Sequence, residues 1–182
     1  GATGCGKSTT LAGMINYRNE KTSSYVLTIE DPIEFLHPNK RSIVNQREIG
    51  VDTKSYARAL KSAMREAPDV ILIGEIRDRE SMEAALNLAG TGHLVITTLH
   101  SNNAPETLDR IINLFPQDQH RQIFMDLSQY LRAIISQRLV RGNDGKRVAA
   151  VEVLLNTPHL SELINRGEIA QVKEAFATSS EA

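Results

Sequence analysis

The sequence predicts an α/β fold in which a mostly parallel sheet is flanked by helices, followed by a C-terminal hairpin and further helices. Two observations predict this class. Short apolar, β-branched runs alternate with longer segments of helical periodicity, which is the pattern of parallel strands joined by crossover helices. The chain has 182 residues, of which 41% are hydrophobic, enough for one domain with its own core.

The chain begins with a glycine-rich stretch that fits a phosphate-binding loop: a Gly, four residues, then Gly-Lys-Ser. Glycines let the backbone turn its N–H groups inward, and a helix predicted over 8–19 adds the positive end of its dipole. In this interpretation Lys7 reaches the β- and γ-phosphates of a nucleotide and the Ser8 hydroxyl ligates Mg²⁺. The predicted nucleotide-binding residues are Gly1, Ala2, Thr3, Gly4, Cys5, Gly6, Lys7, Ser8 and Thr9. The alternative is a glycine-rich turn that only caps a helix. Within the loop, Cys5 is expected to be a small filler, and the alternative for it is an oxidation-sensitive thiol.

A predicted strand over 25–29 runs directly into three acidic residues, Glu30, Asp31 and Glu34. Pro32 ends the strand and forces a turn, so the acids fall near its carboxyl end. Ligands of parallel sheets bind at that edge. Glu34 is a candidate general base, and the alternative is that the acids cap a turn and are solvated. Beyond them we expect a short strand over 42–45, a loop over 46–52 and a helix over 53–67.

The run over 70–73 is continuously apolar, as expected for a strand buried on both faces. It ends in Gly74 and Glu75, so it resembles a Walker B element in which Gly74 replaces the usual Mg²⁺-binding Asp. Two roles stay open for Glu75: it reaches Mg²⁺ through a water, or it positions the attacking water. Arg77 and Asp78 extend this charged cluster, and a helix over 79–89 follows.

His93 and His100 flank the next predicted strand, 94–99. An extended strand of that length separates them by about 23 Å, so they do not share a metal ion or a phosphate. His100, at the carboxyl end, is the candidate phosphate sensor. His93, at the opposite end, is expected to be structural or to lie at an interface.

The remaining chain reads as helices and one hairpin. Helices are predicted over 105–114, 117–135, 158–165 and 168–177, with strands over 137–140 and 147–154 around a turn at 141–146. Residues 1–155 are assigned to the core domain and residues 156–182 to a C-terminal helical segment.

Composition excludes several classes of protein. The net charge of −1 gives no basic groove for nucleic acid. A single Cys excludes a disulfide framework and a cysteine zinc site. No apolar run reaches the roughly 20 residues of a membrane span, so no membrane insertion is predicted. The chain has no initiator Met and no strand before Gly1, and its last residues are small and polar. We therefore expect a fragment, truncated at both ends, with little or no ATPase activity by itself.

Four ordered motifs resemble the ATPases of type II secretion and type IV pilus systems. The stretch 64–78 resembles that family's signature, 29–35 its Asp box, and 91–100 its His box, and 45–48 and 136–139 also match. The similarity is greatest to the pilus retraction ATPases and their paralogues. The residues at 97–104 and 108–112 resemble the paralogues more.

The resemblance implies a RecA-like P-loop ATPase core that binds ATP and Mg²⁺ without zinc. It implies Glu34 as the catalytic acid of the Asp box and Glu75 as the Walker B acid, although the two glutamates could exchange duties. It implies a homo-hexamer, or a mixed ring with a paralogous ATPase, that acts on an inner-membrane pilus platform protein from the cytoplasmic side. A PAS-like domain that precedes the core in the family is absent from this sequence. The alternatives are a pilus extension or type II secretion ATPase, and a non-hydrolysing nucleotide-binding partner subunit.

Overall fold

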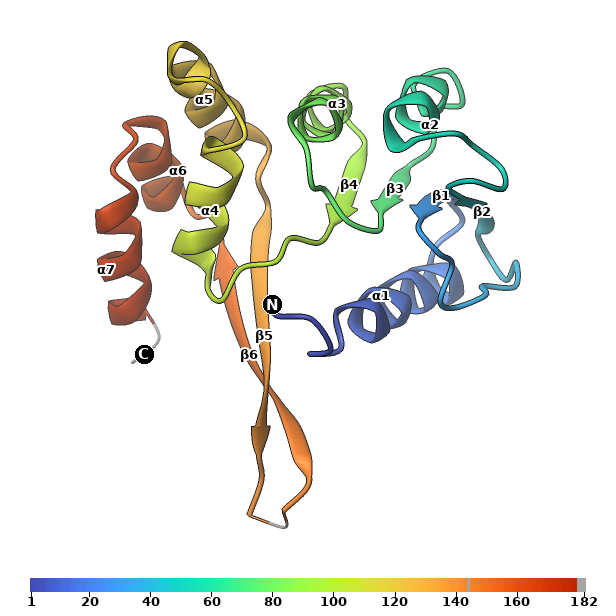
Figure 1. Ribbon diagram of the computed structural model, residues 1–182, viewed down its shortest axis with the longest axis horizontal. Coiled ribbons are helices and arrows are strands. Elements are labelled where there is room, and N and C mark those ends of the chain that lie inside the picture. The colour runs from blue at the N-terminus through green and yellow to red at the C-terminus, as the bar shows by residue number, and fades with distance from the viewer. Residues whose placement is uncertain (144, 180–182) are drawn as a thin grey trace. The chain divides into compact units, whose positions relative to one another are not determined.

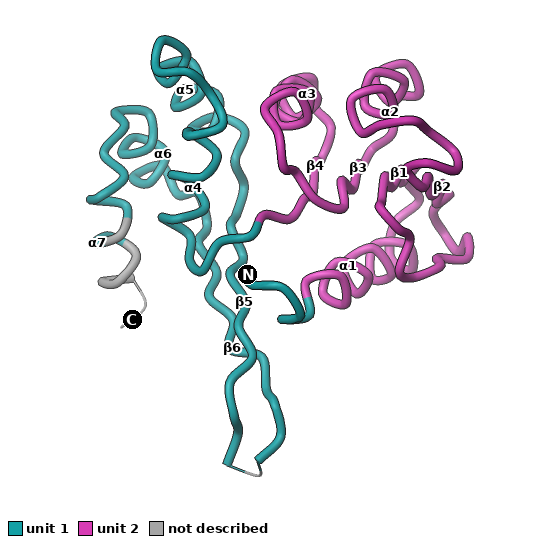
Figure 2. Tube along the Cα trace, viewed as in Figure 1, with its two compact units in different colours: residues 1–6, 100–182 teal, residues 7–99 magenta. Residues whose placement is uncertain are grey.

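The structure of the chain is a computed structural model that describes residues 1–143 and 145–179. These residues form two compact units, one of Lys7–Leu99 and one that joins Gly1–Gly6 to the chain from His100 onward (Figure 2). Asp144 of the predicted hairpin turn, and the last three residues of the predicted C-terminal segment, lie outside the described residues. The boundary predicted between residues 155 and 156 stays a prediction.

The unit of Lys7–Leu99 is built on a parallel sheet, as predicted. Its strands are β1 (Tyr25–Glu30), β2 (Ile43–Glu48), β3 (Val70–Ile73) and β4 (Leu94–Thr97), in the order β2-β1-β3-β4. The central strands are almost entirely buried, which explains their continuous apolar runs. The carboxyl ends of β1 and β3 lie next to each other, since Ile29 pairs with Ile73.

Helices cover both faces of this sheet (Figure 1). Helix α1 (Lys7–Lys21) lies on one face, and helices α2 (Tyr56–Ala63) and α3 (Arg79–Gly90) lie on the other. On the α1 side, the fully buried Ile15 packs against Val26, Val70 and Leu72. This packing fixes the direction of α1, whose first residue is Lys7 of the glycine-rich loop.

Two boundaries predicted in this unit were wrong. The expected loop over 46–52 begins later, because Gln46, Arg47 and Glu48 continue β2 through parallel pairing with β1. The helix expected over 53–67 is shorter at both ends. It starts after Ser55, whose side chain accepts a hydrogen bond from the Arg58 N–H, and it ends at Ala63.

The other unit contains a hairpin and helices. The hairpin is the antiparallel pair β5 (Ala133–Arg141) and β6 (Arg147–Leu155). The helices are α4 (Ala104–Ile112), the single 3₁₀ turn η1 (Gln117–Gln119), α5 (His120–Tyr130), α6 (Pro158–Asn165) and α7 (Ile169–Ser179). Buried Leu108, Leu154 and Ile164 form part of its core.

The single helix expected over 117–135 was also wrong. Helix α5 ends at Tyr130, the backbone of Leu131 is extended, and Ala133 already belongs to β5. Strand β5 is therefore longer than the predicted 137–140. The apolar pair Ile134 and Ile135 suits either element locally, and pairing with Leu154 and Val153 of β6 decides for the strand.

Candidate active site

The glycine-rich loop forms the tight turn that the motif predicts. Gly4 and Gly6 have φ angles of 73° and 90°, a region that favours glycine because a Cβ is strained there. The Cys5 N–H donates to the Ala2 carbonyl at 3.4 Å, and Cys5 is buried. A buried side chain agrees with the filler role for Cys5 rather than with a reactive thiol.

The first residues of α1 bring a hydroxyl to the connection between β1 and β2, residues 31–42, which we call the acidic loop. The Ser8 hydroxyl donates a hydrogen bond to Glu34 Oε1 at 3.0 Å. The two residues are 26 positions apart in sequence and were predicted separately, one as a metal ligand and the other as a base. Their contact places a nucleotide-loop hydroxyl and a carboxylate at one point of the fold.

Side chains of β2 support the acidic loop. The Gln46 side chain accepts a hydrogen bond from the His37 N–H at 2.8 Å and donates to the Phe35 carbonyl at 2.8 Å. A Glu48 carboxylate oxygen accepts from the Ile33 N–H at 2.9 Å. These bonds hold the backbone on both sides of Glu34, a role that the sequence did not indicate when residues 46–52 were expected to be a loop.

Glu30 does not face solvent in the way a turn-capping acid would. One of its oxygens, Oε1, accepts hydrogen bonds from Thr28 at 2.7 Å and from Gln46 at 3.3 Å. Asp31 is exposed and precedes Pro32 through a cis peptide bond. Of the three acids, Glu30 is therefore fixed within the strand end, and Glu34 is the one in contact with the start of α1.

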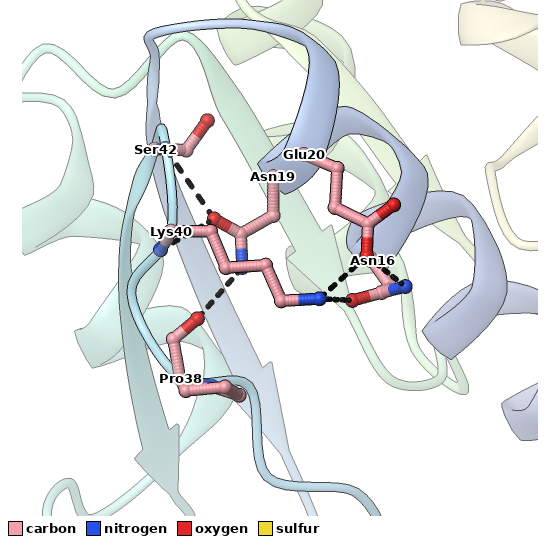
Figure 3. Close-up of polar contacts among 6 residues, drawn as sticks. All are labelled: Asn16, Asn19, Glu20, Pro38, Lys40 and Ser42. Carbon is pink, nitrogen blue, oxygen red and sulfur yellow. Dashed lines mark hydrogen bonds and ion pairs between the residues drawn. The ribbon is translucent and has the colours of Figure 1, made fainter.

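The far end of α1 is tied to the same connection (Figure 3). The fully buried Asn19 donates to the Pro38 carbonyl at 2.7 Å and accepts from the N–H groups of Lys40 and Ser42 at 3.1 and 3.3 Å. Asn19 satisfies the backbone of a turn that would otherwise leave buried donors unpaired. Lys40 adds an ion pair with Glu20 at 2.6 Å, which lowers the pKa of Glu20 through its hydrogen bond.

The segment after β3 places Glu75 against a guanidinium group. Arg77 Nε and a terminal nitrogen of Arg77 lie 2.9 and 2.7 Å from Glu75 Oε2. This hydrogen bond raises the pKa of Arg77. The Glu75 side chain is 19% exposed and that of Arg77 is 73% exposed. Asp78, predicted as part of the charged cluster, instead caps α3: its carboxylate accepts from the Ser81 N–H at 2.8 Å.

Tyr56 is a site residue that sequence reasoning missed. A Cβ built on Gly74 would lie 3.4 Å from the Tyr56 hydroxyl and 3.4 Å from the Glu30 Cα. The Tyr56 hydroxyl therefore borders the position that a side chain at residue 74 would take. Burial, together with the charge of Asp31, raises the pKa of Tyr56 to about 12, so the phenol is protonated at neutral pH and able to donate a hydrogen bond.

The two histidines have different surroundings. His93 Nδ1 lies 3.0 Å from the Leu88 carbonyl and 3.0 Å from the Thr91 hydroxyl, contacts that join the end of α3 to β4 and fit the structural role predicted for it. His100 Nδ1 lies 3.4 Å from the Thr3 hydroxyl of the glycine-rich loop. The His100 carbonyl accepts from Arg110 at 2.7 Å. His100 thus contacts the predicted phosphate-binding loop, and its role as a phosphate sensor stays a prediction.

The donor set at Ser8 and Glu34 suits a hard cation. Mg²⁺ prefers oxygen ligands and is usually held by one or two carboxylates, waters and substrate phosphates rather than by an all-protein cage. A hydroxyl and a carboxylate in contact fit that preference. Within residues 1–143 and 145–179, no group of three or more His, Cys, Asp or Glu is arranged to hold a metal ion by itself. In the same ranges, no helix is long and apolar enough to cross a membrane.

Comparison with known proteins identifies the family. The family model for Type II/IV secretion system proteins matches residues 1–157, so the chain belongs to that family. It is 53% identical over its whole length to the type IV pilus ATPase PilU of Pseudomonas aeruginosa, covering 48% of that protein. It is 47% identical over 98% of its length to the pilus retraction ATPase PilT of the same organism, covering 52%. The chain spans about half the length of these curated relatives.

A solved structure confirms the fold. The crystal structure of the pilus retraction motor PilT with bound ADP superposes with a TM-score of 0.94 at 50% identity, over 98% of this chain and 52% of that one. The predicted P-loop ATPase fold is thereby confirmed. The identity to PilU of Pseudomonas aeruginosa is greater than that to PilT of the same organism, in agreement with the resemblance of residues 97–104 and 108–112 to the paralogues of the retraction ATPases.

Proposed function

We propose that this chain is the nucleotide-binding core of an ATP-hydrolysing motor subunit that powers type IV pilus retraction. The observation that carries the proposal is the hydrogen bond from Ser8 to Glu34. It joins the end of a phosphate-binding loop to a carboxylate on the adjacent acidic loop. Phosphoryl transfer to water requires both parts close together.

Each site residue has a chemical task in this proposal. The N–H groups of the glycine-rich loop and Lys7 bind the phosphates. Ser8 would hold Mg²⁺, and Glu75 would either contribute to that site or orient the attacking water. Mg²⁺, when bound, neutralises charge on the phosphates. Glu34 orients the water and accepts its proton. Tyr56 remains protonated and is available as a donor beside Glu75.

The proposed assembly is the one that the family resemblance implies. Pilus motors named PilU and PilT resemble this chain over nearly its full length, and the ADP in the PilT structure supports a nucleotide as ligand. The proposed working form is a homo-hexamer, or a mixed ring with a paralogous ATPase, in contact with an inner-membrane pilus platform protein at the cytoplasmic base of the pilus. Hydrolysis would drive rotation between subunits.

The test uses the full-length protein and the substitution Lys7→Ala. Purified wild-type protein should hydrolyse ATP, and the variant should lose ATP binding and turnover. Lys21→Ala, at the other end of α1, is the matched control and should retain activity. Wild-type protein without ATPase activity would contradict the enzymatic part of the proposal.

The direction of the motor is tested in cells. Cells that produce the Lys7→Ala variant instead of the wild type should keep surface pili but lose twitching motility. Loss of the surface pili would contradict a retraction motor and would favour pilus extension.

A further inference from the structure

Gln137 in the middle of β5 contacts the glycine-rich loop from the far part of the chain. Its side-chain Nε2 donates a hydrogen bond to the Cys5 carbonyl at 2.6 Å, across 132 positions of sequence. Gln137 is 8% exposed although it is polar. Burying an amide is costly unless it is hydrogen-bonded, so this contact has a structural requirement behind it.

Two glycines of the loop are shaped around the same residue. A Cβ built on Gly1 would lie 2.5 Å from the Gln137 carbonyl oxygen and 2.6 Å from Cys5 Sγ. A Cβ built on Gly6 would lie 2.9 Å from Gln137 Nε2. Real Cβ atoms do not approach other atoms this closely. Gly1 therefore leaves no room for a side chain beside the β5 backbone, whereas Gly6 combines a φ of 90° with a close approach of the Gln137 amide.

The bond to the Cys5 carbonyl also sets the direction of the next donor. The peptide unit between Cys5 and Gly6 is planar and trans, so its C=O and N–H groups point in opposite directions. Holding the Cys5 oxygen on Gln137 turns the Gly6 N–H away from Gln137. An N–H whose direction is already fixed costs little reorganisation when an anion binds to it.

We propose that Gln137 is a positioning residue that fixes the Cys5–Gly6 peptide so that the Gly6 N–H is preset for a nucleotide phosphate. The inference rests on the proposed nucleotide-binding function and adds to it a part played by the hairpin. Gln137 touches the loop backbone through the Cys5 carbonyl. Its effect is on affinity for phosphates.

The experiment compares Gln137→Met with wild type in the full-length protein. Methionine has a similar length and no donor. ADP binding, measured by calorimetry, should weaken by about fivefold or more, the factor that corresponds to one buried hydrogen bond. KM for ATP should rise by a similar factor and by more than kcat falls. The melting temperature without nucleotide should stay close to that of the wild type, whereas the rise in melting temperature that ADP produces should shrink. Gln122→Met is the matched control, since Gln122 lies exposed on α5 and bonds only Asp126 among the described contacts.

A second variant protects the test from a folding defect. Gln137→Glu places a carboxylate against the Cys5 oxygen, and repulsion between two acceptors should weaken ADP binding further than Gln137→Met does. If Gln137→Met loses its cooperative melt, Gln137→Asn replaces it and should show the same loss of ADP affinity, because its shorter amide does not reach. Wild-type affinity for ADP in a folded Gln137→Met or Gln137→Asn protein would overturn the inference. Absence of ADP binding by the wild type would instead overturn the proposed function.

Discussion

The acidic segments that follow β1 and β3 differ in the group that is bonded to their glutamates. The strands are neighbours, and each is followed by a candidate catalytic carboxylate. Glu34 is exposed and accepts a hydrogen bond from a neutral hydroxyl. Glu75 is more buried and is paired with the Arg77 guanidinium. A carboxylate bound by a hydroxyl keeps its charge available to take a proton, whereas one paired with a cation is better suited to hold that cation in place. The comparison therefore favours Glu34 as the base.

The largest expected effect distinguishes the two glutamates directly. Glu34→Gln should lower kcat by about a hundredfold or more, the usual contribution of a general base, with ADP affinity close to that of the wild type. Glu75→Gln should lower kcat by a smaller factor. Steady-state kinetics of the full-length variants measure both. A larger loss in Glu75→Gln than in Glu34→Gln would reverse the assignment, and normal turnover in both would end it.

The next effect concerns the support of the first segment alone. Gln46→Leu removes the bonds to His37, Phe35 and Glu30 and leaves a backbone N–H without its acceptor. The free energy of unfolding should fall by about 2 kcal/mol, and kcat should fall with it because Glu34 is no longer held. Urea unfolding and kinetics measure these changes, with Gln122→Leu as the control. Unchanged kcat would mean that the β2 side chains do not position Glu34.

A third test asks whether Glu75 acts through Arg77. If the pair works as a unit, Glu75→Gln, Arg77→Gln and the double variant should lower kcat by the same factor to within about twofold, since coupled residues are not additive. Multiplied losses in the double variant would show independent roles. Arg79→Gln is a suitable control, because Arg79 lies in the first turn of α3 beyond this pair and lies 4.0 Å from Glu83.

The smallest effect is a pH dependence confined to the acidic loop. Burial lowers the pKa of His37 below its ordinary value of 6.5, against a smaller opposite effect from Glu30. The folded state thus favours the neutral ring. Its stabilising contribution is fully present above pH 6.5 and is lost as the pH falls from there through the lowered pKa of the folded state. The wild-type melting temperature should therefore drop more between pH 7 and pH 5 than that of His37→Gln. Equal drops would show that His37 has no part in it.

The sequence predicted the centre of the sheet well because β1 and β3 are buried on both faces. Runs such as Val70–Ile73 have no polar residue that would allow another element, so local pattern and tertiary environment agree. The prediction failed for Gln46 to Glu48, whose polar side chains resemble a loop. Those side chains are polar because they bond the loop beside them, and the strand is specified by backbone pairing with β1.

Residues of the candidate site were predictable where their role follows from the chemistry of the residue type. They were not predictable where the role depends on a contact in the folded structure. Lys7, Ser8, Glu34 and Glu75 follow from motif and position. Tyr56 and Gln137 do not, because their roles depend on what they touch: the space beside Gly74 and the carbonyl of Cys5. Spacing in the sequence contains no signal for either contact. The glycine at position 74 was the visible sign that this strand end differs from the usual Walker B element, and the Tyr56 hydroxyl lies beside it.

The connection between β1 and β2 is hydrogen-bonded to α1 near both ends of the helix. Glu34 meets Ser8 near the beginning of the helix, and Pro38, Lys40 and Ser42 meet Asn19 near its end. The eleven positions from Ser8 to Asn19 rise by about 16 Å at 1.5 Å per residue. The two attachments of the connection to α1 are therefore separated by most of the length of the helix. Attachment at two separated points resists rotation of the connection about either point. The acidic loop is therefore held against the first helix near both ends of that helix.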